Sequence, residues 1–308
     1  MPFSHHSHSG QFCGHATNTL DEVVQAAINK GMTTFCLTEH IPRERIDFYP
    51  REEEEHTPET LYKLFDDYYR EARRLQAVYK DQIVLFIGFE GEWIRPSSLT
   101  IIHDLLSRYE VDLFLGSVHH VHTIPIDYDP PVYHRARDVG NATDERIFQD
   151  YFDAQLAMLE ALHPPIVAHF DLIRLFSDQP NQTWKTWPSV WAKLLRNLRF
   201  IADYGGVLEL NSSSLRKGMT EAYPQVEVCQ EFKALGGRFT LSDDSHGVPH
   251  VGLNYDKVLD CVKRAGIADV CHLAPVSDTV KPHDSRFPNV GWQTVSVADL
   301  EKHPFWAN

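Results

Sequence analysis

The pattern of apolar positions first predicts a helix and then a strand. Apolar side chains within residues 20–28 recur at three- and four-residue spacing, which is typical of an amphipathic helix that Asn18 or Thr19 caps. Residues 33–38, with the sequence Thr-Thr-Phe-Cys-Leu-Thr, form a short apolar run that predicts a buried strand. Together with a strand over residues 1–6, these segments make a strand-helix-strand unit.

The same alternation continues along the chain. Further strands are expected at residues 83–89, 113–117, 165–168, 207–210 and 238–241. Helices are expected at residues 58–80, 97–109, 143–162, 188–204 and 225–235. About seven strands that alternate with helices predict an α/β fold, a parallel and closed or nearly closed barrel, and a single domain over residues 1–308.

Three segments do not follow the alternation. Residues 41–57 hold prolines, arginines and a run of four glutamates, and are expected to form a solvated loop or a lid. Residues 121–142 contain three prolines and are expected to be irregular. The tail over about residues 270–308 is expected to pack beneath or across a core of about residues 1–255, as a C-terminal extension.

Composition narrows the class of protein. With 43% hydrophobic and 23% charged residues, the 308-residue chain has the balance of a soluble globular protein, and we expect neither a membrane span nor a signal peptide. Five scattered cysteines without Cys-x-x-Cys spacing argue against a disulfide framework and favour the cytoplasm. The net charge of -14 argues against nucleic-acid binding. A small phosphorylated partner stays compatible with that charge, because metal ions supply local positive charge.

Side chains that bind metals follow the predicted strands one after another. Those at or just after the carboxyl ends are His6, His8, His40, Glu90, His119, His169, Asn211, Asp244 and His246. In an α/β barrel these ends converge on one face, where active sites are built. With His15, and without Asn211, the set offers nine nitrogen and carboxylate ligands, which is more than one tetrahedral ion needs. The sequence therefore predicts a multinuclear metal site.

Three alternatives stay open at this point. The His-rich start of the chain is also typical of a purification tag or a disordered tract. The run Ser242-Asp243-Asp244-Ser245-His246 offers two aspartates, of which the spacing to His246 favours Asp244 over Asp243. The tandem His119-His120 offers two imidazoles, and the order Gly-Ser-Val-His favours His119.

Taken together, these motifs resemble the polymerase-and-histidinol-phosphatase family, and specifically its monofunctional histidinol-phosphatase branch. The motifs that carry the resemblance are His6-Ser7-His8, Cys13-Gly14-His15, Thr38-Glu39-His40, Gly88-Phe89-Glu90, Gly116-Ser117-Val118-His119, Ala168-His169-Phe170-Asp171, Asn211 with Leu215-Arg216, and Asp244-Ser245-His246. The resemblance covers roughly residues 1–255. It implies a distorted seven-stranded (β/α)7 TIM-like barrel with three divalent ions, zinc being favoured over iron or manganese.

The resemblance also implies a ligand set and an activity. One ion would be held by His6, His8, Glu90 and Asp244. Glu90 would bridge to a second ion, held by His119 and His169, and the third would be held by His15, His40 and His246. The implied reaction is hydrolysis of L-histidinol phosphate to L-histidinol and phosphate in histidine biosynthesis.

The chemistry expected of such a cluster is phosphoester hydrolysis. Clustered divalent ions lower the pKa of bound water and neutralise phosphoryl oxygens, so that hydroxide attacks phosphorus, with Glu90 and Asp244 at the centre. Substrate contacts are expected from Arg216, Lys217, Arg174 and Asn211, of which Arg216 is best placed to bind phosphate oxygens. Asp171 is a candidate general acid or a residue that orients a ligand.

Other functions share part of this pattern. A metal-dependent amidohydrolase also begins with His-x-His, but would need a lysine ligand that no predicted strand end offers. A polymerase-associated exonuclease should carry a basic groove, which the net charge opposes. A non-catalytic metal-binding scaffold would have lost some ligands, whereas all nine are present. A phosphoesterase of the same family that acts on another small phosphate ester stays an alternative.

Overall fold

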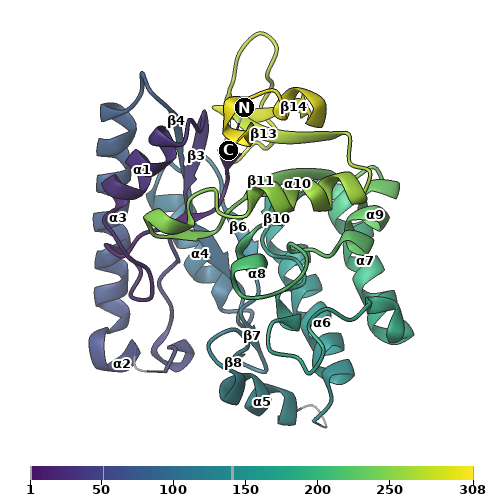
Figure 1. Ribbon diagram of the computed structural model, residues 1–308. Helices are drawn as coiled ribbons and strands as arrows, with labels where there is room; N and C mark the ends of the chain where they lie inside the picture. Colours follow the sequence, from purple (N-terminus) through teal and green to yellow (C-terminus); the bar gives the residue numbers. More distant parts are fainter. Residues whose placement is uncertain (1, 51, 140–141, 308) are drawn as a thin grey trace.

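The computed structural model describes residues 2–50, 52–139 and 142–307, and Figure 1 shows its elements. The strands are β1 (Phe3–Ser4), β2 (Ser7–His8), β3 (Thr34–Leu37), β4 (Val84–Ile87), β5 (Glu90–Glu92), β6 (Leu115–Ser117), β7 (His120–Val121), β8 (Ile124–Pro125), β9 (Ile166–Val167), β10 (Val207–Asn211), β11 (Arg238–Ser242), β12 (Ser245–His246), β13 (Asp269–Pro275) and β14 (Val290–Ser296). The α-helices are α1 (Leu20–Asn29), α2 (Glu52–Glu55), α3 (Pro58–Val78), α4 (Ser98–Arg108), α5 (Pro130–Val139), α6 (Asp144–Leu162), α7 (Pro188–Tyr204), α8 (Ser213–Arg216), α9 (Val226–Ala234), α10 (Tyr255–Arg264) and α11 (Val297–Leu300). Among the described helices, none combines the length and the apolar character that a membrane crossing requires.

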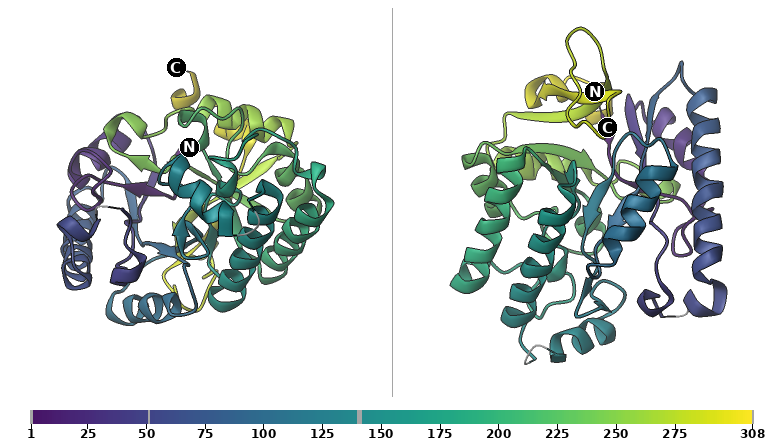
Figure 2. Two further views of the ribbon diagram at one scale, coloured as in Figure 1. Left: turned by 90° about the horizontal axis from the view of Figure 1, so that it is seen from below. Right: turned by 180° about the vertical axis from the view of Figure 1, so that it is seen from behind.

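The strands of the mixed α/β fold pair in parallel in two main sheets. One sheet has the order β1-β3-β4 and the other the order β11-β10-β9-β6-β5. Backbone hydrogen bonds connect the sheets on both sides: Glu90 N donates to Glu39 O (3.0 Å) and Asp112 N to Ile87 O (2.7 Å), while His5 N donates to Leu241 O (3.2 Å). Helices α1 and α3 lie on one side of the strands and α6, α7 and α9 on the other (Figures 1 and 2).

The long helix α3 shows how local sequence produces this packing. Thr57 accepts a hydrogen bond from Thr60 N, and Pro58 occupies the first turn, where its missing N–H costs nothing. Leu61, Phe65, Tyr68, Ala72 and Leu75, at helical spacing, form its buried face. The buried Tyr68 hydroxyl lies 2.6 Å from Leu37 O and 2.8 Å from Gly88 O, and so ties α3 to the ends of β3 and β4.

A close backbone approach explains the glycine after β4. A Cβ atom at Gly88 would lie 2.5 Å from the carbonyl oxygen of Leu113, which is closer than real Cβ contacts allow. The missing side chain lets the segment that leads into β5 run directly beside the segment that leads into β6. Glu90, two residues further on, begins β5 and pairs in parallel with Leu115 of β6.

The expectation of an irregular segment at residues 121–142 is wrong for most of its described part, and residues 140 and 141 lie outside the described residues. Strands β7 and β8 form an antiparallel hairpin whose two turn residues, His122 and Thr123, have positive φ angles of 54° and 63°, as a tight two-residue turn requires. Helix α5 follows, and its two prolines sit in the first turn, where proline is tolerated. Asp129 accepts a hydrogen bond from Val132 N at 2.7 Å and thus caps the helix.

Two further segments have more structure than their sequence pattern predicts. Residues 52–55, expected in a loop or lid, form the short helix α2. In the tail, β13 and β14 form an antiparallel hairpin that packs against β11. The buried His5 links this hairpin to the start of the chain, because its Nε2 accepts a hydrogen bond from Leu273 N at 3.0 Å.

Tyr68 offers a test of how α3 is attached. Replacing it with phenylalanine removes a buried hydroxyl and leaves backbone carbonyl groups less satisfied, so we expect Tyr68→Phe to lower the free energy of unfolding by about 1–2 kcal/mol. Urea denaturation followed by circular dichroism measures the loss. The control is Tyr69→Phe, since the Tyr69 hydroxyl bonds to Glu110 O at an exposed site. Equal stability of the two variants would contradict the attachment.

Candidate metal centre

Glu90 lies at the middle of the polar cluster, and its two carboxylate oxygens face different histidines. Oε1 is 2.8 Å from His169 Nε2 and 3.2 Å from His119 Nε2. Oε2 faces three other imidazoles, at 3.0 Å (His40 Nδ1), 3.3 Å (His6 Nε2) and 3.5 Å (His8 Nε2). This division is the geometry expected of a carboxylate that can contact two neighbouring cations at once.

The second carboxylate of the cluster comes from Asp244. Its Oδ1 lies 3.6 Å from His8 Nε2 and 3.8 Å from His6 Nε2, and its backbone has a φ of 48°, which turns the side chain back toward β2. Asp243 points elsewhere, since its carboxylate accepts hydrogen bonds from Ser4 Oγ, Ser245 N and Gly252 N. The position of each side chain favours Asp244 over Asp243, as the spacing to His246 does.

A third group gathers nearer the surface. The Nε2 atoms of His15 and His246 are 3.0 Å apart, and these two residues lie with His40 and Cys13 in a set whose ligand atoms are all within 4.8 Å of one another. The Sγ of Cys13, a buried residue, is 3.4 Å from the His15 ring nitrogens. The sequence motif marked His15 but not its cysteine neighbour as a candidate ligand.

A row of carboxylates stands behind the imidazoles. Glu209 lies 3.1 Å from His6 Nδ1, Glu39 lies 3.4 Å from His8 Nδ1, and Glu92 lies 3.2 Å from His119 Nδ1. A carboxylate at Nδ1 fixes the orientation of the ring and leaves Nε2 as the ligand atom.

Sequence reasoning missed these three carboxylates, although a signal was available for two of them. Glu92 follows Glu90 by two residues and Glu209 precedes Asn211 by two, which places each pair on one face of a strand. Glu39 directly precedes His40, and no periodicity marks it.

Burial and neighbouring charges together shift the pKa values of the groups in the cluster. Burial disfavours the charged form of His6, yet the carboxylates of Glu90, Glu209 and Asp244 raise its pKa well above the usual value. Burial together with the nearby His40 and His246 lowers the pKa of His8. Burial raises the pKa of Glu90, but His119 and His6 outweigh it and hold that pKa well below its usual value.

The cluster has the donor atoms of a divalent metal centre. His6 Nε2, His8 Nε2 and both nitrogens of His40 are buried without a hydrogen-bond partner in the part of the chain that the structure describes. Buried polar atoms are normally satisfied, so a set of unpartnered nitrogen atoms that face shared points fits the binding of cations. Imidazole and carboxylate ligands fit zinc, iron or manganese better than calcium or magnesium.

The other predicted substrate contacts lie in two places. Arg216 and Lys217, at the end of α8, line the cavity described below, and the Arg216 Nη atoms donate to Asp243 O (3.1 Å) and Asp244 O (2.9 Å). Asn211 is buried and does not line this cavity. It donates to Glu209 Oε1 at 2.7 Å and accepts from Ser213 N, so it orients neighbouring groups instead.

The positions of Asp171 and Arg174 do not support the roles expected of them. They form a buried ion pair at 3.1 Å, outside the set of residues that line the cavity. Asp171 also accepts from Trp184 Nε1 and Gln225 N, and Arg174 donates to three backbone carbonyls. Both side chains thus stabilise the loop after β9, because the chain turns away from the cluster directly after His169.

His120 is likewise separate from the cluster, which favours His119 in the tandem pair. The buried His120 Nδ1 lies 3.1 Å from Glu92 Oε1, and its ring meets the Tyr49 ring edge-on, with the ring centroids 5.2 Å apart.

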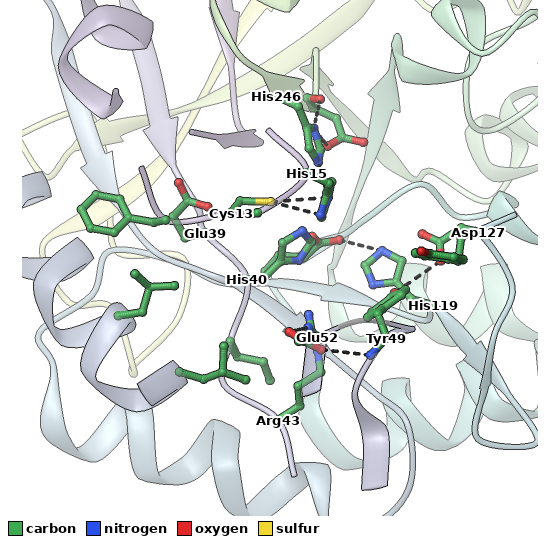
Figure 3. A pocket seen from close by; sticks show the side chains of 18 of the residues that line it. Cys13, His15, Glu39, His40, Arg43, Tyr49, Glu52, His119, Asp127 and His246 are labelled. Carbon is green, nitrogen blue, oxygen red and sulfur yellow. Dashed lines mark hydrogen bonds and ion pairs between the residues drawn. The ribbon is translucent and has the colours of Figure 1, made fainter. Parts of the chain in front are cut away.

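A cavity of about 530 Å³ lies over the cluster (Figure 3). The candidate metal ligands on its wall are His15, His40, Glu90, His119, His169, Asp244 and His246. An apolar part is lined by Phe12, Leu61, Leu64, Phe65 and Tyr68, and a polar part by Arg43, Tyr49, Glu52, Glu55, Asp127, Arg216 and Lys217. The cavity thus offers positive charge, negative charge and apolar surface beside one candidate metal centre.

Comparisons with known proteins show which family the chain belongs to. The model of the PHP domain family matches residues 4–213. A probable histidinol-phosphatase of Schizosaccharomyces pombe is 46% identical over 274 residues, covering 88% of this chain and 89% of the relative. The histidinol-phosphatase of Saccharomyces cerevisiae is 34% identical and covers 99% of both chains.

Two solved structures share the fold. A putative histidinol phosphatase from Listeria monocytogenes superposes with a TM-score of 0.72 at 20% identity, covering 82% of this chain and 98% of the other. The histidinol phosphate phosphatase from Lactococcus lactis, complexed with zinc, L-histidinol and phosphate, superposes with a TM-score of 0.67 at 21% identity, covering 87% and 95%. The family match covers more than half of the chain, and it confirms the resemblance carried by the motifs: the chain belongs to the PHP domain family.

Proposed function

We propose that this chain is a metal-dependent histidinol-phosphatase that hydrolyses L-histidinol phosphate to L-histidinol and inorganic phosphate. The observation that carries the proposal is the histidine and carboxylate cluster at the wall of a cavity that also holds Arg216 and Lys217. Membership of the PHP domain family and the two fungal relatives named as histidinol-phosphatases support it. All five cysteines are free, which is in keeping with a reaction in the reducing cytoplasm.

The proposal includes three divalent ions, with zinc as the favoured metal. The first would be held by His6, His8, Glu90 and Asp244, the second by Glu90, His119 and His169, and the third by His15, His40 and His246. The support is the division of the Glu90 contacts between its two oxygens and the separate group around His15. When bound, such ions lower the pKa of water and neutralise the charge of phosphoryl oxygens.

The side chains around the centre prepare it for a phosphate ester. Glu39, Glu92 and Glu209 hold the rings of three histidines, so that their orientation need not change during the reaction. Arg216 is anchored on the carbonyls of Asp243 and Asp244, which keeps its positive charge beside the cluster. Lys217 is exposed at the cavity wall and supplies a second cation for the phosphate.

We also propose that the parallel strands close into a distorted seven-stranded barrel in a single domain. The backbone hydrogen bonds from Glu90 to Glu39, from Asp112 to Ile87 and from His5 to Leu241 support closure, since they bridge the gaps between the two main sheets. The structural neighbours support the same fold. A single hydrophobic cluster that extends from Phe3 to Leu300 supports one domain.

The first test of the function is substrate selection. Purified protein loaded with zinc or manganese is assayed for phosphate release across a panel of phosphorylated metabolites. We expect the highest kcat/KM for L-histidinol phosphate. Higher efficiency on another small phosphate ester would assign a different substrate, and hydrolysis of cyclic amides without phosphate release would favour an amidohydrolase.

Metal binding has a readout that does not depend on activity. Stripping the protein with a chelator should lower its thermal midpoint, and added zinc should restore it, because a ligand at 100 times its Kd stabilises the folded state by about 2.7 kcal/mol per site. Elemental analysis should find close to three ions per chain. We expect His15→Gln to lose one ion, and the control His122→Gln, on the β7–β8 turn, to keep all of them. A wild-type protein that holds at most one ion would refute the trinuclear centre.

The bridging role of Glu90 can be separated from a structural one. Glutamine keeps the size of the side chain but loses its charge, so Glu90→Gln should lower turnover by several orders of magnitude while the fold and the site around His15 persist. Turnover, thermal midpoint and metal content are measured on the same sample. Glu160→Gln, an exposed position on α6, serves as the control. Near-normal turnover of Glu90→Gln with full metal occupancy would exclude the bridge.

A further inference from the structure

The β7–β8 hairpin brings a carboxylate to the cluster that is not among the proposed metal ligands. Ile126 N donates to His119 O at 2.9 Å, so the returning strand runs directly beside His119. Asp127 follows, half-buried, and its side chain lines the cavity next to the His119 ring (Figure 3).

Asp127 is only weakly satisfied by its surroundings. Its Oδ1 lies 3.3 Å from the Tyr49 hydroxyl, which is also 3.3 Å from Glu92 Oε1 and has a single proton to donate. Within residues 2–50, 52–139 and 142–307, no Lys, Arg or His nitrogen lies within 4.0 Å of the Asp127 carboxylate. A half-buried carboxylate in this state favours a cationic partner.

The other acidic groups on the cavity wall are less suited to a cation. Glu52 is neutralised by Arg43 at 2.6 Å and accepts from Tyr49 N. Glu39 accepts two hydrogen bonds from Ser9, each of 2.8 Å. Glu55 is exposed, so solvent screens its charge. Asp127 is therefore the carboxylate best placed to bind a cation beside the cluster.

The proposed substrate has a cationic group that must lie close to the reacting phosphate. L-Histidinol phosphate carries its amine on the carbon next to the ester CH₂ group, so a phosphate held at the metal centre holds the ammonium beside that centre. A residue that binds the ammonium group must therefore lie next to the proposed metal-binding side chains, as Asp127 lies next to His119. Glu55 lies on the short helix α2, and its exposure leaves its charge in solvent.

We propose that Asp127 binds the ammonium group of the substrate and selects phosphate esters of vicinal amino alcohols. The inference rests on the proposed function. The Tyr49 hydroxyl contacts the carboxylate on one side, and the β7–β8 hairpin positions it from the other side. The ion pair forms with the phosphate bound at the centre, so it contributes to the affinity of the whole substrate and of the product L-histidinol.

The test compares two substrates that differ only in the amine. The first is L-histidinol phosphate and the second is its deamino analogue, 3-(imidazol-4-yl)propyl phosphate. We expect Asp127→Asn to lower kcat/KM for L-histidinol phosphate by about 10- to 100-fold, as for loss of a charge-assisted hydrogen bond, and to change kcat/KM for the analogue by less than about 3-fold. The inhibition constant of L-histidinol, measured against the analogue, should rise by a similar factor.

A matched control guards against an indirect effect. Asp129→Asn removes the same charge two residues away, outside the cavity, and asparagine retains the cap on α5. Metal content and thermal midpoint are measured for both variants, so that a loss of metal or of folding is seen directly. Asp129→Asn should match the wild-type protein on both substrates.

Two results would overturn the inference while leaving the proposed function in place. An equal loss on both substrates with full metal content would mean that Asp127 acts on chemistry common to them, such as proton transfer to the leaving oxygen. Unchanged kinetics and unchanged inhibition by L-histidinol would mean that Asp127 does not bind the ammonium group. A wild-type protein that fails to hydrolyse L-histidinol phosphate would instead overturn both the proposed function and the inference.

Discussion

The buried carboxylate of Glu90, surrounded by imidazole nitrogens, is the interaction on which the rest of the centre depends. A charge with this degree of burial is tolerated only when other charges or hydrogen bonds compensate it. The backbone fixes its place: Glu90 pairs in parallel with Leu115 on one side and forms a bridge to His40 on the other. The position of this carboxylate is therefore set by strand pairing rather than by the flexible part of its own side chain.

Charged and polar side chains behind the cluster connect it to the cavity wall. Glu92 contacts His119 and His120 and also binds Arg43 Nε at 2.9 Å. Arg43 in turn pairs with Glu52 and lies over the Tyr49 ring. Arg43, Tyr49 and Glu52 are thus connected to the cluster through a chain of charged and polar contacts. Because these contacts are connected, a change in the cluster will also change the position of the side chains that line the cavity.

The C-terminal hairpin of β13 and β14 contacts the start of the chain. His5 accepts from Leu273 N, whereas its neighbour His6, in the short segment between β1 and β2, points into the cluster. Burial and the nearby His272 lower the pKa of His5 to about 3, so that it stays neutral and its Nε2 can accept this hydrogen bond. Through His5, the C-terminal hairpin therefore helps to position the neighbouring His6.

Most elements could be predicted because their signals are local. The helix expected at residues 58–80 is observed as Pro58–Val78, since a cap, a first-turn proline and an apolar stripe are all visible in the sequence. The ligand candidates were predictable for a related reason, namely that parallel strands bring their carboxyl ends to one face. The prolines suggested irregular structure for residues 121–142, but proline is also tolerated in the first turn of a helix, where Pro130 and Pro131 lie.

Spacing along the chain was enough to identify the strand-helix alternation and the histidines and carboxylates that follow the strands. It left undecided which member of each adjacent pair enters the cluster, because the direction of a side chain after a strand depends on how the backbone turns there. Asp244 enters through a positive φ, whereas Asp171 turns away to Arg174. Contacts between distant segments, such as Glu209 with His6 and Asp127 beside His119, were decided only when the strands packed together, because no local spacing encodes which residues meet across the fold.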